Sequence, residues 1–136
     1  MTEFPLDIVT PDGEIFSGRA ESLRLRSIEG DLCIRARHTD YVTALGMGPA
    51  EVITAGNKHI AACMGGMLSM MQGECHLLAT TFEWADAIDA ERAARSKARA
   101  EEMLAQKNLD KRDMELAEAR LRRALVRSSV AARKDI

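Results

Sequence analysis

One acidic residue and several arginines recur at helical spacing near the middle of the chain, in the stretch EWADAIDAERAARSKARAEEML that begins at Glu83. Asp89, Arg92 and Arg99 fall at positions i, i+3 and i+10, so all three project from one face of a helix. The opposite face carries alanines and Leu104, and alanine favours helix while burying little area. We therefore expect a helix that is weakly anchored to whatever it rests on. The ordinary interpretation of its charges is a solvated surface with ion pairs four residues apart.

Groups that could perform catalysis do not converge elsewhere in the sequence. There is no G-x-x-x-x-G-K-[ST] loop, and Ser69 lies in MLSMM rather than in a G-x-S-x-G elbow. The pair Glu101 and Glu102 lies on an exposed predicted helix, where nothing would desolvate either carboxyl group for acid catalysis. The three cysteines form no C-x-x-C pair and the three histidines are scattered, so no metal site is predicted. The sequence predicts interaction or regulation, with no catalytic residues and no required cofactor.

Charge is distributed unevenly along the 136 residues, which suffice for one domain or for a small domain with an appendage. Residues 1–85 hold 6 basic and 11 acidic side chains, for a net −5, whereas residues 86–136 hold 13 and 10, for a net +3. Aromatic residues make up 4%, too few for a basic surface interleaved with aromatics, so nucleic-acid binding is not predicted. No apolar run approaches the roughly 20 residues of a membrane span, and MTEFPLDIV lacks a signal-peptide pattern. We expect a soluble protein that is not exported.

Two different periodicities divide the chain. From residue 4 to residue 81, short apolar or alternating runs such as FPLDIV, SLRLRS, YVTAL, AEVIT, HIAACM and MLSMM are separated by turn residues, which favours an antiparallel sandwich or flattened barrel. After Trp84 the turn signals vanish, and QKNLDKRD separates one helical pattern from a second that begins near Asp113. The predicted fold class is α+β, with a β domain over residues 1–85 and an antiparallel two-helix hairpin over residues 86–136.

Several segments, in order, resemble the epsilon subunit of bacterial F-type ATP synthases over nearly the whole chain. They are LDIVTPDGEIFSG, EGDLCI followed by His38 and VTAL, GGMLSM, and IDAERA. The resemblance implies a ten-stranded β-sandwich followed by a mobile helical hairpin. It also implies a non-catalytic subunit of the central stalk, which couples ion-driven rotation to ATP synthesis. No transit peptide is evident, so we expect a bacterial protein at the cytoplasmic face of the plasma membrane, held there through its complex.

The resemblance implies partners for the sandwich. It would bind the gamma subunit and touch the polar loops of the membrane c-ring, with Asp31 and His38 in the segment that faces the ring. The alternative for these two residues is a turn acid and a surface histidine. Residues 35–37 read Arg-Ala-Arg where the family usually has Leu-Pro-Gly, and Cys33 replaces the usual glycine. These departures change the allowed backbone angles and add charge near the ring contact.

The resemblance also implies an ATP-binding site, because IDAERA matches the family's Ile-Asp-x-x-Arg-Ala motif. Guanidinium groups that converge from two helices can bind a polyphosphate through bidentate, charge-assisted hydrogen bonds. Asp89 would accept a hydrogen bond from adenine or orient an arginine, and the site would not be hydrolytic. ATP would then be a regulatory ligand. The implied ATP-binding residues are Glu83, Ile88, Asp89, Arg92, Ala93, Arg99, Arg123 and Arg127.

A regulatory mechanism follows from this resemblance. A folded hairpin would permit rotation, whereas an extended hairpin would place Arg122, Arg123 and Arg127 near acidic segments of the catalytic alpha and beta subunits and block ATP hydrolysis. ATP bound only to the folded form would favour that form. One alternative keeps the subunit but makes the hairpin purely structural, with arginines that pair local acids such as Glu91 and Glu115. The other alternative is a free-standing adaptor protein.

Overall fold

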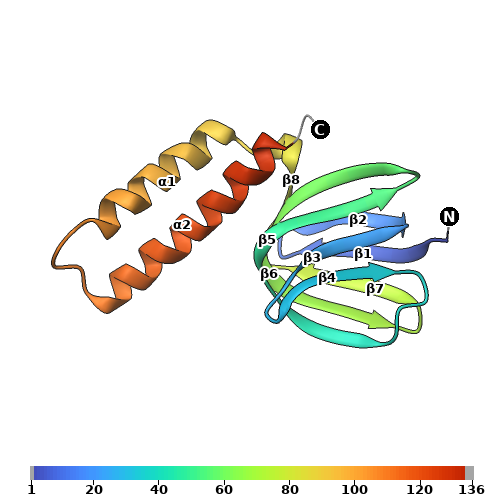
Figure 1. Cartoon of the computed structure of the whole chain (residues 1–136). Helices are drawn as coiled ribbons and strands as arrows, with labels where there is room; N and C mark the ends of the chain where they lie inside the picture. Colours follow the sequence, from blue (N-terminus) through green and yellow to red (C-terminus); the bar gives the residue numbers. More distant parts are fainter. Residues whose placement is uncertain (1, 134–136) are drawn as a thin grey trace. The chain divides into compact units, whose positions relative to one another are not determined.

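The computed structural model describes residues 2–133, and the chain divides into two compact units, residues 1–84 and residues 85–136 (Figure 1). Within the described residues the first unit holds eight strands. Their bounds are β1 Phe4–Thr10, β2 Gly13–Ala20, β3 Ser22–Ser27, β4 Gly30–Arg35, β5 Tyr41–Thr54, β6 Asn57–Met71, β7 Glu74–Ala79 and β8 Phe82–Trp84.

The strands form one sheet in the order β2-β1-β7-β6-β5-β3-β4, and β8 pairs with β6. Each neighbouring pair is antiparallel except β1 and β7, which run parallel with Leu6 opposite Cys75. The predicted β-sandwich is confirmed as the fold of this unit, but two details differ. The described residues form eight strands, so the ten that the resemblance implied are not confirmed, and the pairing is not antiparallel throughout.

The strand count is lower because glycines bend two long strands without ending them. YVTAL and AEVIT both lie in β5, and HIAACM and MLSMM both lie in β6. The β5–β6 pairing skips Gly46 and then resumes in the same register. Gly66 has a φ of +130°, and a Cβ there would lie 2.0 Å from the carbonyl oxygen of Leu78. Because only glycine tolerates this approach, the Gly-Gly pair acts as a bend within β6 and not as the turn that we expected.

Alternating burial along the strands builds one core. In β1 the side chains of Phe4, Leu6 and Ile8 are buried while their neighbours are partly exposed, as the period-two pattern predicts. All eight strands of the described part contribute to the same buried cluster. Cys63 and Cys75 lie in that core, where burial raises their pKa to about 11 and about 12. Both thiols are therefore protonated and inert near neutral pH.

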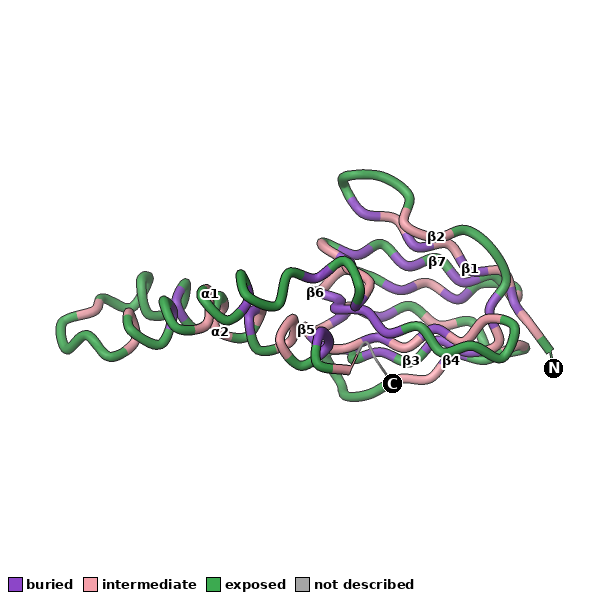
Figure 2. Tube along the Cα trace, turned by 90° about the horizontal axis from the view of Figure 1, so that it is seen from above, coloured by how far each residue is buried: buried purple, intermediate pink, exposed green. Residues whose placement is uncertain are grey.

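The second unit begins with a short 3-10 helix, Ala85–Ala87, followed by helices α1 Ala90–Leu104 and α2 Lys111–Ala132. The two predicted C-terminal helices are confirmed. Few residues along them are buried, as Figure 2 shows. No helix within residues 2–133 is long and apolar enough to span a membrane. The buried helical residues are Ala93, Ala100, Ala117, Ala124, Val130 and Ala131.

Candidate functional site

A groove of about 250 Å³ lies between α1 and α2, and arginines dominate its lining. Because the buried residues beside it are alanines, the two backbones approach closely and long side chains from both helices reach one space. We call this space the arginine groove. It is lined by Ser96, Arg99, Ala100, Met103, Ala117, Arg120, Arg123 and Arg127.

The lining is strongly cationic, since it holds four guanidinium groups and no carboxylate. Among the described residues, Arg99, Arg120 and Arg123 make no hydrogen bond or ion pair. Like charges that face one space repel, and a polyanion placed between them would replace repulsion with charge-assisted hydrogen bonds. The donor set therefore fits a phosphate chain. Within residues 2–133, no group of three His, Cys, Asp or Glu could hold a metal ion.

The Ile-Asp-x-x-Arg-Ala motif starts helix α1. Asp89 is its N-cap residue, and its Oδ1 accepts a hydrogen bond from the backbone N–H of Arg92 at 3.0 Å. Ile88 and Ala93 occupy the two positions that pack together in a hydrophobic staple, and both are buried. Helix initiation thus explains the residue types of Ile88, Asp89 and Ala93 without any ligand. The Arg92 side chain is exposed and does not line the arginine groove.

The structure brings together three of the eight residues predicted to bind ATP, namely Arg99, Arg123 and Arg127. Arg92 lies two turns before Arg99 on the same face of α1. Glu83 lies in β8, in the other unit. Sequence reasoning missed Arg120, although its spacing of three and seven residues from Arg123 and Arg127 places it on their face of α2.

The remaining hairpin charges behave as a solvated surface. Glu91 pairs with Arg95, at 4.0 Å between Oε2 and Nη1, and not with an arginine of the groove. Glu115 makes no ion pair among the described residues. Arg122, predicted as an inhibitory contact, is exposed and outside the groove, whereas the other two predicted inhibitory residues, Arg123 and Arg127, line it.

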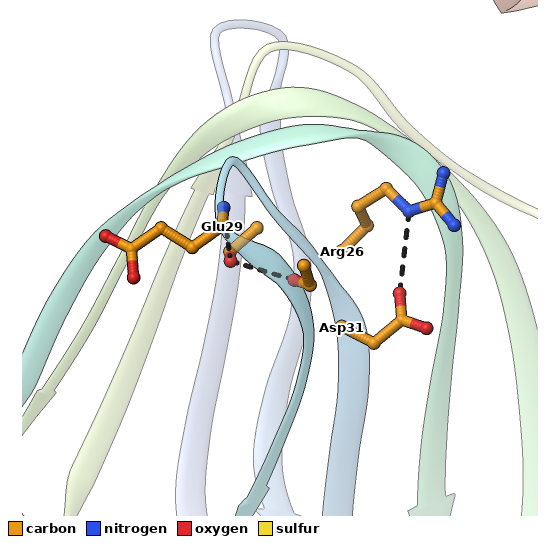
Figure 3. Close-up of polar contacts among 5 residues, drawn as sticks. Arg26, Glu29 and Asp31 are labelled. Carbon is orange, nitrogen blue, oxygen red and sulfur yellow. Dashed lines mark hydrogen bonds and ion pairs between the residues drawn. The ribbon is translucent and has the colours of Figure 1, made fainter.

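The two predicted ring-facing residues lie at opposite ends of β4. Asp31 follows the β3–β4 turn, which Ser27 closes by donating to the carbonyl of Gly30 at 2.8 Å and accepting from the N–H of Glu29 at 3.1 Å (Figure 3). Asp31 is exposed, and its Oδ1 lies 3.5 Å from Nε of Arg26. His38 follows the other end of β4. The two side chains therefore form no common cluster.

The departure from Leu-Pro-Gly has a visible backbone consequence. Arg37, where the resemblance leads us to expect a glycine, adopts a φ of +66°, in the left-handed region that favours glycine. The N–H of His38 donates to the carbonyl of Arg35 at 3.2 Å and closes this turn. The turn thus holds an arginine in a strained conformation.

The structure is that of a small two-part protein, in which a β-sandwich is followed by a helical hairpin with a cationic groove. Residues 3–85 match the family model for the beta-sandwich domain of the ATP synthase delta/epsilon chain, and residues 86–132 match the model for its long alpha-helix domain. The chain therefore belongs to the ATP synthase delta/epsilon chain family.

Curated relatives include bacterial epsilon chains. The ATP synthase epsilon chain of Shouchella clausii (strain KSM-K16) is 36% identical over 134 residues, covering 98% of each chain. That of Bacillus velezensis (strain DSM 23117 / BGSC 10A6 / LMG 26770 / FZB42) is 37% identical over 131 residues, covering 96% of this chain and 98% of the relative. The resemblance to bacterial epsilon subunits is confirmed.

Solved structures share the fold. A chain in the cryo-EM structure of the Euglena gracilis mitochondrial ATP synthase (OSCP/F1/c-ring in rotational state 1) matches with a TM-score of 0.83. The identity is 21%, and the match covers 97% of this chain and 82% of that chain. A chain of the Tetrahymena thermophila mitochondrial central stalk and c-ring matches with a TM-score of 0.65 at 12% identity, covering 96% and 97%.

Proposed function

We propose that the chain is a non-catalytic subunit of the central stalk of a bacterial F-type ATP synthase, where it couples ion-driven rotation to ATP synthesis. The observation that carries this proposal is the match of both family domains, in order, over residues 3–132. The subunit would sit at the cytoplasmic face of the plasma membrane through its complex. Its partners would be the gamma subunit, the c-ring and the catalytic alpha and beta subunits.

An exposed apolar row on the sandwich supports docking on the gamma subunit. Met67 and Leu78 lie opposite each other on β6 and β7, and Ala44 of β5 extends the row. Met67 and Leu78 are 45% and 56% exposed, and exposed apolar groups that gather in one place mark interaction sites. Asp31 and His38, at separate ends of β4, would then contact the rotor at two points, with Asp31 reaching the c-ring from its turn.

A binding experiment tests this role. The full chain should co-purify with the gamma subunit and with a membrane-bound ATPase, and Leu78→Asp should weaken that association strongly by placing a charge in the apolar row. Asn57→Asp adds the same charge at the exposed β5–β6 turn and serves as the control. A chain that never associates with the ATPase would be the free-standing adaptor and would contradict the proposal.

The arginine groove supports a regulatory role for the hairpin. ATP would bind the folded hairpin in this groove and favour it by RT ln(1 + [ATP]/Kd), about 1.4 kcal/mol at ten times Kd. The extended hairpin would use Arg122, Arg123 and Arg127 against the catalytic subunits and block hydrolysis. Because Arg123 and Arg127 line the groove, they cannot serve ATP and the catalytic subunits at once. ATP binding and inhibition would therefore exclude each other.

Calorimetric titration of the full chain with ATP, with ADP as the specificity control, tests the regulatory role. Arg123→Ala should weaken saturable binding because it removes a guanidinium group from the groove. Arg92→Ala should also weaken binding, because the proposed site extends toward the start of α1. Unchanged affinity in Arg92→Ala would remove that residue from the site. No binding at millimolar ATP would favour the purely structural hairpin.

A further inference from the structure

We propose that Arg120 is a phosphate-binding residue, the fourth guanidinium of the arginine groove. This inference rests on the proposed binding of ATP in the groove and deepens it. Arg120, Arg123 and Arg127 form one stripe on α2, with Arg99 contributed from α1. Two helical turns separate the first and last of the stripe, about 10 Å along the axis, so the stripe is long enough to contact more than one phosphate group.

No acidic neighbour offsets the charge of Arg120 on its own helix. The positions three and four residues away hold Leu116, Ala117, Arg123 and Ala124. Within the described residues its guanidinium makes no hydrogen bond and no ion pair. Arg95, another exposed arginine of the hairpin, differs because it has Glu91 four residues before it and pairs with it. At its position, the guanidinium group of Arg120 is therefore repelled by the other arginines of the groove and forms no ion pair on its own helix.

The groove surrounds this uncompensated charge with further cations. Arg123 lies one turn from Arg120 on the same face, and Arg99 and Arg127 line the same space. Small residues hold the two helices close, since Ala100 and Ala117 are buried at the base of the groove. The guanidinium groups are thus held near one another across a narrow space. An anion with several charges is the ligand class that satisfies this arrangement. Arg120 enlarges the phosphate contact beyond Arg99, Arg123 and Arg127, the three groove arginines that were expected from sequence.

The test is calorimetric titration of ATP into the full chain at several ionic strengths, comparing the unchanged protein with Arg120→Gln, Arg120→Lys and Arg112→Gln. Arg112 is an exposed arginine of the same helix that does not line the groove. Arg120→Gln should weaken binding about tenfold, the size expected for one charge-assisted hydrogen-bonded contact. Its binding should also depend less on salt, because one screened attraction is gone.

The two control variants separate phosphate binding from a structural effect. Arg120→Lys keeps the charge but loses the bidentate geometry, so it should recover part of the affinity and the full salt dependence. Arg112→Gln should bind as the unchanged protein does, and circular dichroism should show equal helix content in all variants. If the protein binds ATP and Arg120→Gln binds equally well, the role of Arg120 is wrong while ATP binding stands. If the unchanged protein binds no ATP, both proposals fall.

Discussion

The sandwich and the hairpin differ in what they bury. Fully buried side chains of the sandwich include Phe4, Leu6, Ile8 and Leu68, whereas the buried side chains of the two helices are alanines and one valine. Burying a leucine or phenylalanine contributes about 1.5–3 kcal/mol, and an alanine buries far less area. The sandwich therefore has an independent core, whereas the two helices are held together by a small buried apolar area. A ligand or partner that supplies a few kcal/mol can change the second unit without disturbing the first.

The sandwich and the hairpin also differ in how their charged side chains are distributed. The sandwich carries buried thiols in an apolar core, and its exposed ion pairs are scattered. The hairpin gathers four arginines around one groove and pairs none of Arg99, Arg120 and Arg123 within the described residues. These arginines repel one another beside a small apolar contact, so the pairing of the two helices should be sensitive to anions. The proposed regulation by a ligand would thus act on the second unit.

The largest effect is expected from Gly66→Ala in the sandwich. The new Cβ would lie 2.0 Å from the carbonyl oxygen of Leu78, so β6 and β7 must separate, and we expect a loss of at least about 3 kcal/mol in the free energy of unfolding by urea. Gly30→Ala is the matched control, since Gly30 has a φ of +129° but no atom within 4 Å of the added Cβ. It should lose about 1 kcal/mol from backbone strain alone. Equal losses would show that the close approach to Leu78 does not matter.

A pair of truncations compares the two units directly. Leu68→Ala removes a fully buried side chain and should lower the unfolding free energy of the sandwich by about 2–5 kcal/mol. Ala124→Gly in the hairpin should cost about 1 kcal/mol through lower helix propensity, with the loss confined to α1 and α2. Hydrogen exchange resolved by segment measures both. If Ala124→Gly lowered protection in the sandwich equally, the units would unfold together and the contrast would fail.

Alkaline pH should destabilise the sandwich through its thiols. Because burial raises the pKa of Cys63 to about 11 and of Cys75 to about 12, from 9.0, the folded state holds protons that the unfolded state releases above pH 9. Stability from these protons is present below pH 9 and is lost as pH rises toward 11 or 12, by about 1 kcal/mol per pH unit per thiol. Urea unfolding at pH 8 and pH 10 measures this. Cys63→Ala should reduce the difference, and an unchanged difference would exclude Cys63 as a source.

The smallest effect concerns the start of α1. Asp89→Ala removes the N-cap and should cost about 1 kcal/mol, detected as faster amide exchange in the first turn of α1. Asp89→Asn keeps a capping oxygen and should leave both exchange and ATP binding nearly unchanged. Loss of ATP binding in Asp89→Asn with an intact cap would show that the carboxylate contacts the ligand, in addition to starting the helix.

The sequence predicted the period-two strands and the two helices well, because alternation in FPLDIV and the alanine-rich helical spacing are local signals. It placed a turn at Gly65 and Gly66, and only the tertiary approach to Leu78 shows that they bend one strand. The parallel pairing of β1 with β7 joins segments far apart in the chain, which no local pattern specifies.

The lining of the arginine groove was predicted in part, for a similar reason. Arg99, Arg123 and Arg127 were chosen by their resemblance to a family motif, and all three line the arginine groove. Arg120 was missed although its spacing is visible in the sequence, because which face of α2 meets α1 depends on packing. Asp89 was singled out for a ligand, and the structure gives its carboxylate a capping role.

Hydrogen exchange of the full chain with and without millimolar ATP tests the contrast between the units most directly. We predict that ATP slows amide exchange in α1 and α2 and leaves the core strands of the sandwich unchanged, because the ligand bridges arginines of both helices. Arg123→Ala should abolish that protection. Equal protection of both units, or none in the hairpin at saturating ATP, would contradict the view that the second unit is the nucleotide-responsive part of this subunit.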